Sequence, residues 1–243
     1  MMASRAAIAP EDRLIFALDV PDLETGRNLV RRLGDTVRFY KLGLELFMAD
    51  IGFVLLDELV RQQRKVFVDV KLFDVPATVA RAVDRLADRG ATFITVHGNQ
   101  GMMEAAVAAK GASLKVLAVT ALTSLDRGDL DDLGFACDAQ ALVLSRARRA
   151  LDAGCDGIVS SGLEVPALRQ QLNPRLVVVT PGIRPLENRV EDDQKRVVTP
   201  LQALRNGADY IVIGRPIRDA ADPAQAAAAI QAQIAGYCAS LQP

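Results

Sequence analysis

The sequence has no tryptophan and a single histidine, His97. One histidine excludes a multi-histidine metal site and leaves any Ser/His/Asp arrangement dependent on that residue. The three cysteines, Cys137, Cys155 and Cys238, lie far apart and form no CxxC pair, which argues against a disulfide framework or a zinc site. We therefore expect reduced thiols, no metal, and catalysis that depends on Lys, Asp or Arg.

An excess of charge of one sign is also missing, because 29 Lys and Arg residues face 30 Asp and Glu residues. This balance provides no electrostatic basis for a nucleic-acid or anionic-membrane partner. No run approaches the roughly 18 apolar residues of a membrane span, and the opening MMASRAAIAPEDR lacks a long apolar segment followed by a cleavage site. We expect a cytoplasmic protein that holds any anionic ligand through local groups.

Short apolar runs alternate with segments of helical pattern along the chain, which predicts strands that alternate with helices. The eight strand candidates are RLIFALD (13–19), VRFYKLG (37–43), KVFVDVK (65–71), TFITVH (92–97), LKVLAVT (114–120), DGIVSS (156–161), RLVVVT (175–180) and DYIVIG (209–214). Continuous apolar strands indicate a parallel sheet covered by helices, and the chain has the length of a (β/α)8 barrel, about 250 residues. The sequence predicts an α/β fold, a single (β/α)8 TIM barrel, with a doubly wound open sheet as the alternative.

No Pro/Ser linker, low-complexity run or shift of composition divides the chain. We therefore expect one domain over 1–243, with 1–12 as an N-terminal extension and 13–240 as the barrel. The longest irregular segments, about 123–135 and 182–198, both follow predicted strands. Long loops after barrel strands are where this fold places its chemistry.

Helix boundaries are marked by capping patterns. Thr199-Pro200 and Asp222-Pro223 have the form of an N-cap followed by proline at the first helical position. Ser161 and Glu164 have the spacing of a capping box. These patterns predict helices that begin directly after each of the three caps.

Each predicted strand has a polar or small residue at or just past its C-terminal end, and in a barrel these ends meet at one mouth. They are Asp19, Lys41, Asp69 with Lys71, His97, Thr123, Ser160, Pro181-Gly182 and Gly214-Arg215. Strand ends are often polar only because they are exposed to solvent. At any one position, this exposure is the alternative to a functional role. We interpret the set as a site, and His97 as a strand-end histidine rather than a catalyst.

The segment VFVDVKLFDVPATV (66–79) ends an apolar strand on charged residues. Asp69 and Lys71 are two residues apart, so on a strand their side chains point to the same side, here the barrel interior. A lone buried charge is costly, whereas Asp69, Lys71 and Asp74 can neutralise one another. Nearby carboxylates favour protonated Lys71, a candidate cation and proton donor rather than a Schiff-base nucleophile. The alternative is a solvated strand end, with Asp74 at a helix N-terminus.

Two segments near the C-terminus have the features of a phosphate site. TPGIRP and IVIGRPI follow the predicted seventh and eighth strands, where many barrels bind phosphate. Gly214 allows close approach of the backbone and Arg215 supplies a cation, while Arg184 and Gln194 lie in the preceding long loop. We expect a phosphorylated ligand to be held here.

Together these motifs resemble the orotidine 5′-phosphate decarboxylase family over nearly the whole chain. The matching segments are LIFALDV, YKLGLELF, VFVDVKLFDVPATV, TVHG, VTALTS, TPGIRP and IGRPI. The chain departs from common members at Phe73 and Ala77, where histidine and asparagine are frequent. The resemblance implies a homodimer that decarboxylates orotidine 5′-monophosphate to UMP in pyrimidine biosynthesis, with no cofactor and no metal.

The resemblance implies catalytic roles for the residues that match the charged motif. Asp69 and Lys71 would flank the reacting carbon, C6, and Lys71 would stabilise its developing negative charge and then protonate it. Lys41 and Asp74 would complete an alternating network of lysines and aspartates. Asp74 and Thr78 would reach into the site of the neighbouring subunit.

The resemblance also implies residues that bind the substrate. Asp19 and Lys41 would contact the ribose hydroxyls or the adjacent base, and Thr123 the pyrimidine region. The phosphate would be held by Arg184, Gln194, Gly214 and Arg215. The loop that contains Gln194 would close over the bound ligand and exclude water.

Two other functions stay open. A sugar-phosphate decarboxylase or epimerase of the same barrel superfamily, typically dependent on a divalent metal, resembles this chain in its Asp-x-Lys-x-x-Asp strand. The single histidine and the VPATV continuation favour the pyrimidine enzyme. A non-catalytic protein that binds nucleotide phosphates is the alternative of another class, and its mark would be loss of the lysine, whereas Lys71 is present.

Overall fold

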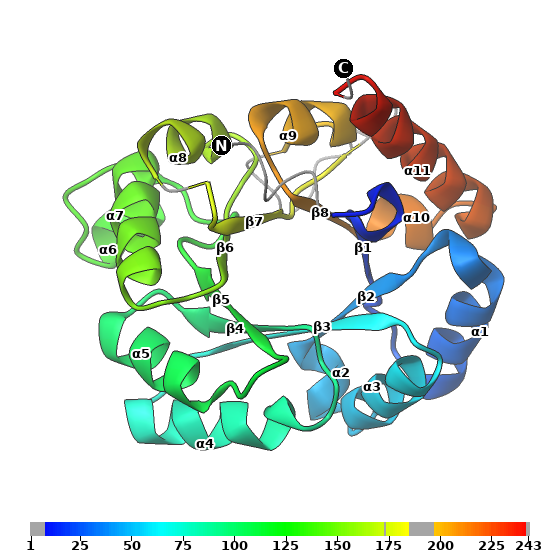
Figure 1. Ribbon diagram of the computed structural model, residues 1–243, viewed down its shortest axis with the longest axis horizontal. Helices are drawn as coiled ribbons and strands as arrows, with labels where there is room; N and C mark the ends of the chain where they lie inside the picture. Colours follow the sequence, from blue (N-terminus) through cyan, green and yellow to red (C-terminus); the bar gives the residue numbers. More distant parts are fainter. Residues whose placement is uncertain (1–7, 173, 185–196, 242–243) are drawn as a thin grey trace.

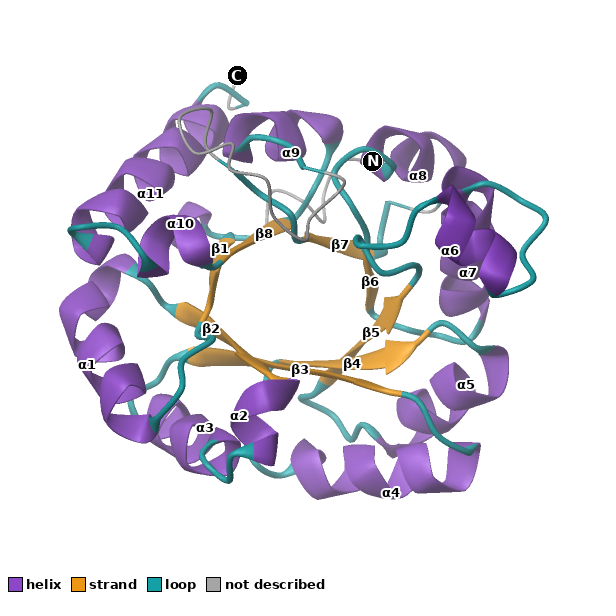
Figure 2. Cartoon of the chain, turned by 180° about the vertical axis from the view of Figure 1, so that it is seen from behind, coloured by secondary structure: helices purple, strands orange, loops and turns teal. Residues whose placement is uncertain are grey.

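Eight parallel strands form a closed barrel in chain order, in which β1 (Leu14–Ala17) pairs with both β2 (Phe39–Gly43) and β8 (Tyr210–Ile213). The computed structural model describes residues 8–172, 174–184 and 197–241. Figures 1 and 2 show the ring of strands with the helices outside it. The predicted (β/α)8 barrel is therefore confirmed, and the open sheet is excluded because β8 closes onto β1.

The strands occupy the eight predicted apolar runs. They are β1 (Leu14–Ala17), β2 (Phe39–Gly43), β3 (Lys65–Leu72), β4 (Phe93–His97), β5 (Lys115–Val119), β6 (Gly157–Val159), β7 (Val177–Thr180) and β8 (Tyr210–Ile213). Both faces of these strands are apolar because one faces the barrel interior and the other faces the helices. This double burial explains why the runs show little alternation.

A short helical turn precedes β1, and the other helices follow strands and cover the barrel. They are η1 (Pro10–Asp12), α1 (Leu23–Leu33), η2 (Gly34–Thr36), α2 (Leu44–Met48), α3 (Gly52–Arg61), α4 (Pro76–Ala87), α5 (Gln100–Ala109), α6 (Arg127–Asp132), α7 (Ala139–Asp152), α8 (Val165–Gln171), α9 (Pro200–Asn206), α10 (Arg215–Arg218) and α11 (Pro223–Ala239). Thr199 and Asp222 cap α9 and α11 as predicted. The prediction of a capping box at Ser161 is wrong. Helix α8 begins after Glu164, and the Ser161 hydroxyl accepts from the amide of Leu163.

Aromatic rings fill the barrel interior below the C-terminal ends of the strands. Phe39, Phe93 and Tyr210 contact one another with ring centroids 5.2 to 5.8 Å apart, and Phe67 lies 5.9 Å from Phe93. Truncation of such a buried ring to alanine costs about 3–5 kcal/mol in comparable cores. The rings therefore form a rigid floor, which supports whatever lies above them at the mouth.

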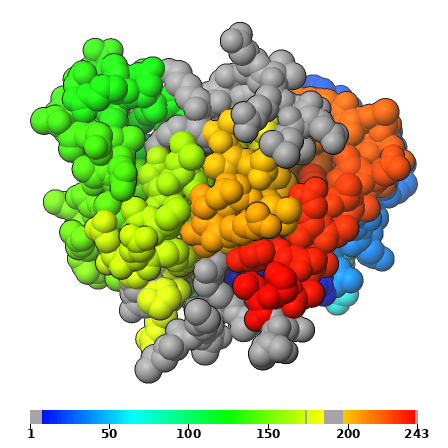
Figure 3. Space-filling model, turned by 90° about the horizontal axis from the view of Figure 1, so that it is seen from above, coloured from blue at the N-terminus to red at the C-terminus, as the bar shows by residue number. Residues whose placement is uncertain are grey.

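Near the C-terminal end of the described chain, α11 packs beside α9. Figure 3 shows α11 in red beside α9 in orange, and the hydroxyl of Tyr237 on α11 donates to the carbonyl of Leu204 on α9 over 3.0 Å. Within the described part of the chain, no helix is long and apolar enough to cross a membrane.

Candidate active site

A cavity of about 580 Å³ opens at the C-terminal ends of the strands. Phe67 of the aromatic floor lies at its base, and apolar residues such as Val119 and Val159, the last residues of β5 and β6, line its wall. The polar lining residues come from the ends of β1, β2 and β3 and from the segments after β5, β7 and β8. The cavity thus combines an apolar base with charged walls.

Most residues of the predicted site line this one cavity. They are Asp19, Lys41, Asp69, Lys71, Thr123, Pro181, Gly182, Arg184, Gly214 and Arg215. Gln194 lies outside the described residues. Asp74 and Thr78 border a separate, shallower depression beside β3 and α4.

Two strand-end residues, His97 and Ser160, do not line the cavity, contrary to the expectation that all eight strand ends converge there. Val159 points inward, so Ser160, the next residue, points away from the interior. The ring of His97 packs instead on Phe73, with centroids 4.7 Å apart. Burial, Arg146 and Lys71 all lower the pKa of His97, which favours the neutral ring.

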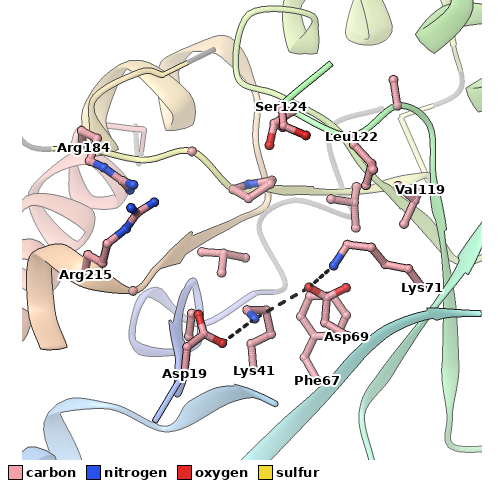
Figure 4. A pocket seen from close by; sticks show the side chains of 18 of the residues that line it. Asp19, Lys41, Phe67, Asp69, Lys71, Val119, Leu122, Ser124, Arg184 and Arg215 are labelled. Carbon is pink, nitrogen blue, oxygen red and sulfur yellow. Dashed lines mark hydrogen bonds and ion pairs between the residues drawn. The ribbon is translucent and has the colours of Figure 1, made fainter. Parts of the chain in front are cut away.

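Four charged side chains form a continuous chain across one wall of the cavity (Figure 4). Lys41 Nζ lies 3.1 Å from Asp19 Oδ1 and 3.8 Å from Asp69 Oδ2. Lys71 Nζ lies 3.0 Å from the same Asp69 oxygen. Aspartates and lysines therefore alternate, and Asp69 is the shared counterion of both lysines.

Asp69 stays ionised despite its burial. Burial would raise the pKa of this carboxyl, but the positive charges of Lys41 and Lys71 and hydrogen bonds from Lys71 and Thr95 outweigh it, so its pKa is lowered. Its side chain is only 12% exposed, whereas that of Lys71 is 39% exposed. A fixed buried anion thus faces an ammonium group that solvent can reach.

The backbone that presents Lys71 is not a regular strand. Lys71 has a φ of +49°, a left-handed conformation that few non-glycine residues adopt. The pairing of β3 with β4 shifts register between Val68 and Leu72. Asp69 and Lys71 both face the cavity, as strand alternation suggested, but an irregular strand end is what holds Lys71 there.

Two arginines lie on another side of the cavity. Figure 4 shows the guanidinium groups of Arg184 and Arg215 pointing into it from the side opposite Lys71. At Gly214 a Cβ atom would lie 3.2 Å from the Cβ of Ala17, so a side chain there would crowd the end of β1. Glycine avoids this contact, and Gly214 lines the cavity together with two cations that suit a phosphate group.

The segment after Lys71 is exposed. Phe73 and Val75 are 63% and 62% exposed, large values for apolar side chains. Asp74 is also exposed, and its carboxylate accepts a local hydrogen bond, 2.6 Å, from the amide of Val75. Asp74 thus does not line the cavity of its own chain.

Sequence reasoning missed some residues around the cavity. Ser124 and Arg218 line it, and Arg218 also donates to the carbonyl of Asp19 over 2.9 Å. Thr95 lies below it and contacts both Asp69 and Lys71. Thr95 could have been found as a polar residue in an otherwise apolar strand. The sequence gives no such signal for Arg218, because only folding brings α10 beside β1.

The described residues contain no group of three or more His, Cys, Asp and Glu side chains that could hold a metal ion. The charges of the cavity are instead arranged as lysine–aspartate pairs on one side and arginines on the other. This arrangement can neutralise an anion at one end of a ligand and stabilise negative charge at the other.

The fold and the cavity define a (β/α)8-barrel protein with a charged site at the C-terminal face of the barrel. The model of the orotidine 5′-phosphate decarboxylase / HUMPS family matches residues 12–230. The chain belongs to this family. The predictions of this family and of an enzyme of its class are thus confirmed.

Similar proteins match this chain over nearly the whole length of both. An orotidine 5′-phosphate decarboxylase of Methylococcus capsulatus is 66% identical over 231 residues, 95% of each chain. One from Rhodopseudomonas palustris is 50% identical over 233 residues, 96% of this chain and 98% of the relative. The crystal structure of the enzyme from Lactobacillus acidophilus has a TM-score of 0.80 at 35% identity and covers 92% of this chain and 99% of that one.

Proposed function

We propose that this protein converts orotidine 5′-monophosphate to UMP and CO₂ without a cofactor, as a step of pyrimidine biosynthesis. The observation that carries the proposal is the buried, ionised Asp69, which lies 3.0 Å from the ammonium group of Lys71 at the wall of the cavity. The names of relatives up to 66% identical support the same activity. Loss of substrate absorbance on addition of purified protein, with a chelator present, tests it; activity that requires added metal would favour a metal-dependent sugar-phosphate enzyme instead.

Lys71 acts on the charge that forms when CO₂ leaves. The bond between C6 and the carboxylate carbon breaks, its electron pair stays on C6, and the ammonium of Lys71 stabilises that charge before it transfers a proton to C6. UMP results, and neutral Lys71 regains its proton from solvent, which its 39% exposed side chain allows. Asp69 orients Lys71, while Lys41, itself held by Asp19, balances the charge of Asp69.

The arginine side of the cavity binds the phosphate of the substrate. Arg184, Gly214 and Arg215 line this end, and Gln194, which lies outside the described residues, is proposed as a further phosphate ligand. Thr123 and Asp19 contact the pyrimidine and ribose. Phosphate binding far from C6 thereby contributes binding energy that organises the reacting groups.

Replacement of Arg215 by alanine should raise KM for orotidine 5′-monophosphate by about a hundredfold or more, because a charge-assisted contact to phosphate is lost. Steady-state kinetics measure the change. Arg205→Ala, on the exposed face of α9, is the matched control and should leave KM unchanged. An equal KM for Arg215→Ala and wild type would remove Arg215 from the phosphate site.

The active unit is a homodimer in which Asp74 and Thr78 of one subunit complete the site of the other. The exposure of Asp74, together with the exposed Phe73 and Val75 beside it, supports this proposal. Buried apolar area drives most stable subunit contacts. The protein works in the cytoplasm as one domain, with no nucleic-acid or membrane partner.

Mixing two inactive variants tests the shared site. Lys71→Ala and Asp74→Ala should each be inactive alone, whereas a mixture after subunit exchange should recover up to about a quarter of wild-type activity, because half of the random dimers carry one intact site. Two Lys71→Ala preparations mixed in the same way are the control. A mixture that stays inactive, although mixed dimers form, contradicts sharing of Asp74.

A further inference from the structure

Thr95 lies fully buried in the middle of β4, directly above the aromatic floor. Its hydroxyl makes two hydrogen bonds: it accepts from the backbone amide of Lys71 over 3.0 Å and donates to Asp69 Oδ1 over 2.9 Å. The direction of both bonds is set by chemistry, because an amide only donates and an ionised carboxylate only accepts. One side chain thus contacts both members of the Asp69–Lys71 pair.

The register of the sheet explains why a hydroxyl is needed at this place. Val68 pairs with Ile94 and Leu72 pairs with Val96, so three residues of β3 lie opposite Thr95 alone. The extra residues break the regular ladder, and a buried amide without a partner is costly. The Thr95 hydroxyl gives the amide of Lys71 its partner, at the residue whose φ is +49°.

The hydroxyl also gives the two oxygens of the Asp69 carboxylate different partners. Oδ1 accepts from Thr95, which leaves Oδ2 for Lys71 at 3.0 Å and Lys41 at 3.8 Å. A hydrogen bond to one oxygen restricts rotation of the carboxylate, so the other oxygen keeps its direction toward the lysines. Thr95 does not itself line the cavity.

We propose that Thr95 is a positioning residue, whose hydroxyl fixes both the carboxylate of Asp69 and the backbone of Lys71 in the geometry that the reaction requires. The role rests on the proposed decarboxylation for its kinetic effect, but not for its structural effect. Packing alone does not account for threonine here, since valine has the same branched shape and is common in barrel interiors.

The variants Thr95→Val and Thr95→Ser distinguish the effect of the hydroxyl from that of the methyl group. Thr95→Val should lower kcat about tenfold to a hundredfold, the size of effect when a hydrogen bond to a charged group is lost. KM for orotidine 5′-monophosphate should stay within about twofold, because Thr95 does not line the cavity. Thr95→Ser keeps the hydroxyl and should retain kcat within about threefold.

Two kinetic results would overturn the role: wild-type kcat in Thr95→Val, or an equal loss in Thr95→Ser, which would assign the effect to packing of the methyl group. If Thr95→Val does not fold, Thr95→Cys replaces it, since a thiol is a weak donor and acceptor. If the wild-type protein shows no decarboxylation, the proposed function fails, and a crystal structure of Thr95→Val decides the positioning role separately. The Lys71 backbone or the Asp69 carboxylate should then have shifted; an unchanged geometry overturns the inference.

Discussion

Lys71→Ala should lose at least about four orders of magnitude in kcat for decarboxylation of orotidine 5′-monophosphate, because in the proposed reaction one ammonium group supplies both electrostatic stabilisation of C6 and its proton. Binding of UMP, measured by calorimetry, should remain detectable, since the arginine side of the cavity is unchanged. Loss of turnover with retained binding would locate the defect in the chemical step. Substantial turnover without Lys71 would contradict its role as proton donor.

Lys65→Ala is the matched control on the same strand. Lys65 is the first residue of β3, at the opposite end of the barrel from the cavity, and pairs with Asp12 over 2.6 Å. Its side chain is 44% exposed, and exposed ion pairs contribute little to stability. This variant should keep wild-type kcat and KM, which shows that removal of a β3 lysine is not harmful in itself.

Asp69→Asn should lower kcat about a hundredfold or more, because it removes the buried counterion that Lys41 and Lys71 share. Asparagine keeps the shape and can still accept from Thr95, so loss of charge is the main change. The matched control is Asp156→Asn, a partly buried aspartate that lies away from the cavity and pairs with Lys110 over 2.5 Å. Equal kcat in Asp69→Asn and wild type would contradict the charge network.

The free energy of unfolding of Asp69→Asn should also differ from that of wild type in its dependence on pH. The pKa of Asp69 is lowered in the folded protein, so its ionised form adds stability that is fully present above the ordinary value of 3.8 and is lost as the pH falls through the lower folded-state pKa. The difference in free energy of unfolding between wild type and Asp69→Asn should be constant near neutral pH and shrink below 3.8. A difference that grows on acidification would mean that the charged form is not the stabilised one.

Much of the barrel is predictable from local pattern. A strand buried on both faces reads as an apolar run whatever its neighbours are, so the runs that became β1 to β8 were visible without tertiary information. Helix starts at Thr199 and Asp222 were visible for the same reason, since a cap acts on amides two or three residues away. The Ser161 pattern failed because a turn at Leu163 uses the same hydroxyl.

The site was predictable only where its residues follow directly from strand ends. Lys41, Asp69 and Lys71 lie on the strands themselves, so their positions near the strand ends were enough to predict that they meet at one mouth of the barrel. The left-handed backbone of Lys71 depends on the register between β3 and β4, which no single segment encodes. Arg218 reaches Asp19 across 199 residues of sequence, and such a contact exists only once β8 closes onto β1.

Product analysis in heavy water tests the central claim most directly. Wild-type protein, incubated with orotidine 5′-monophosphate and a chelator, should release one CO₂ per substrate consumed and form UMP that carries one deuterium at C6, since the proton of Lys71 exchanges with solvent. No consumption of substrate, a requirement for added metal, or a product other than UMP would contradict the account.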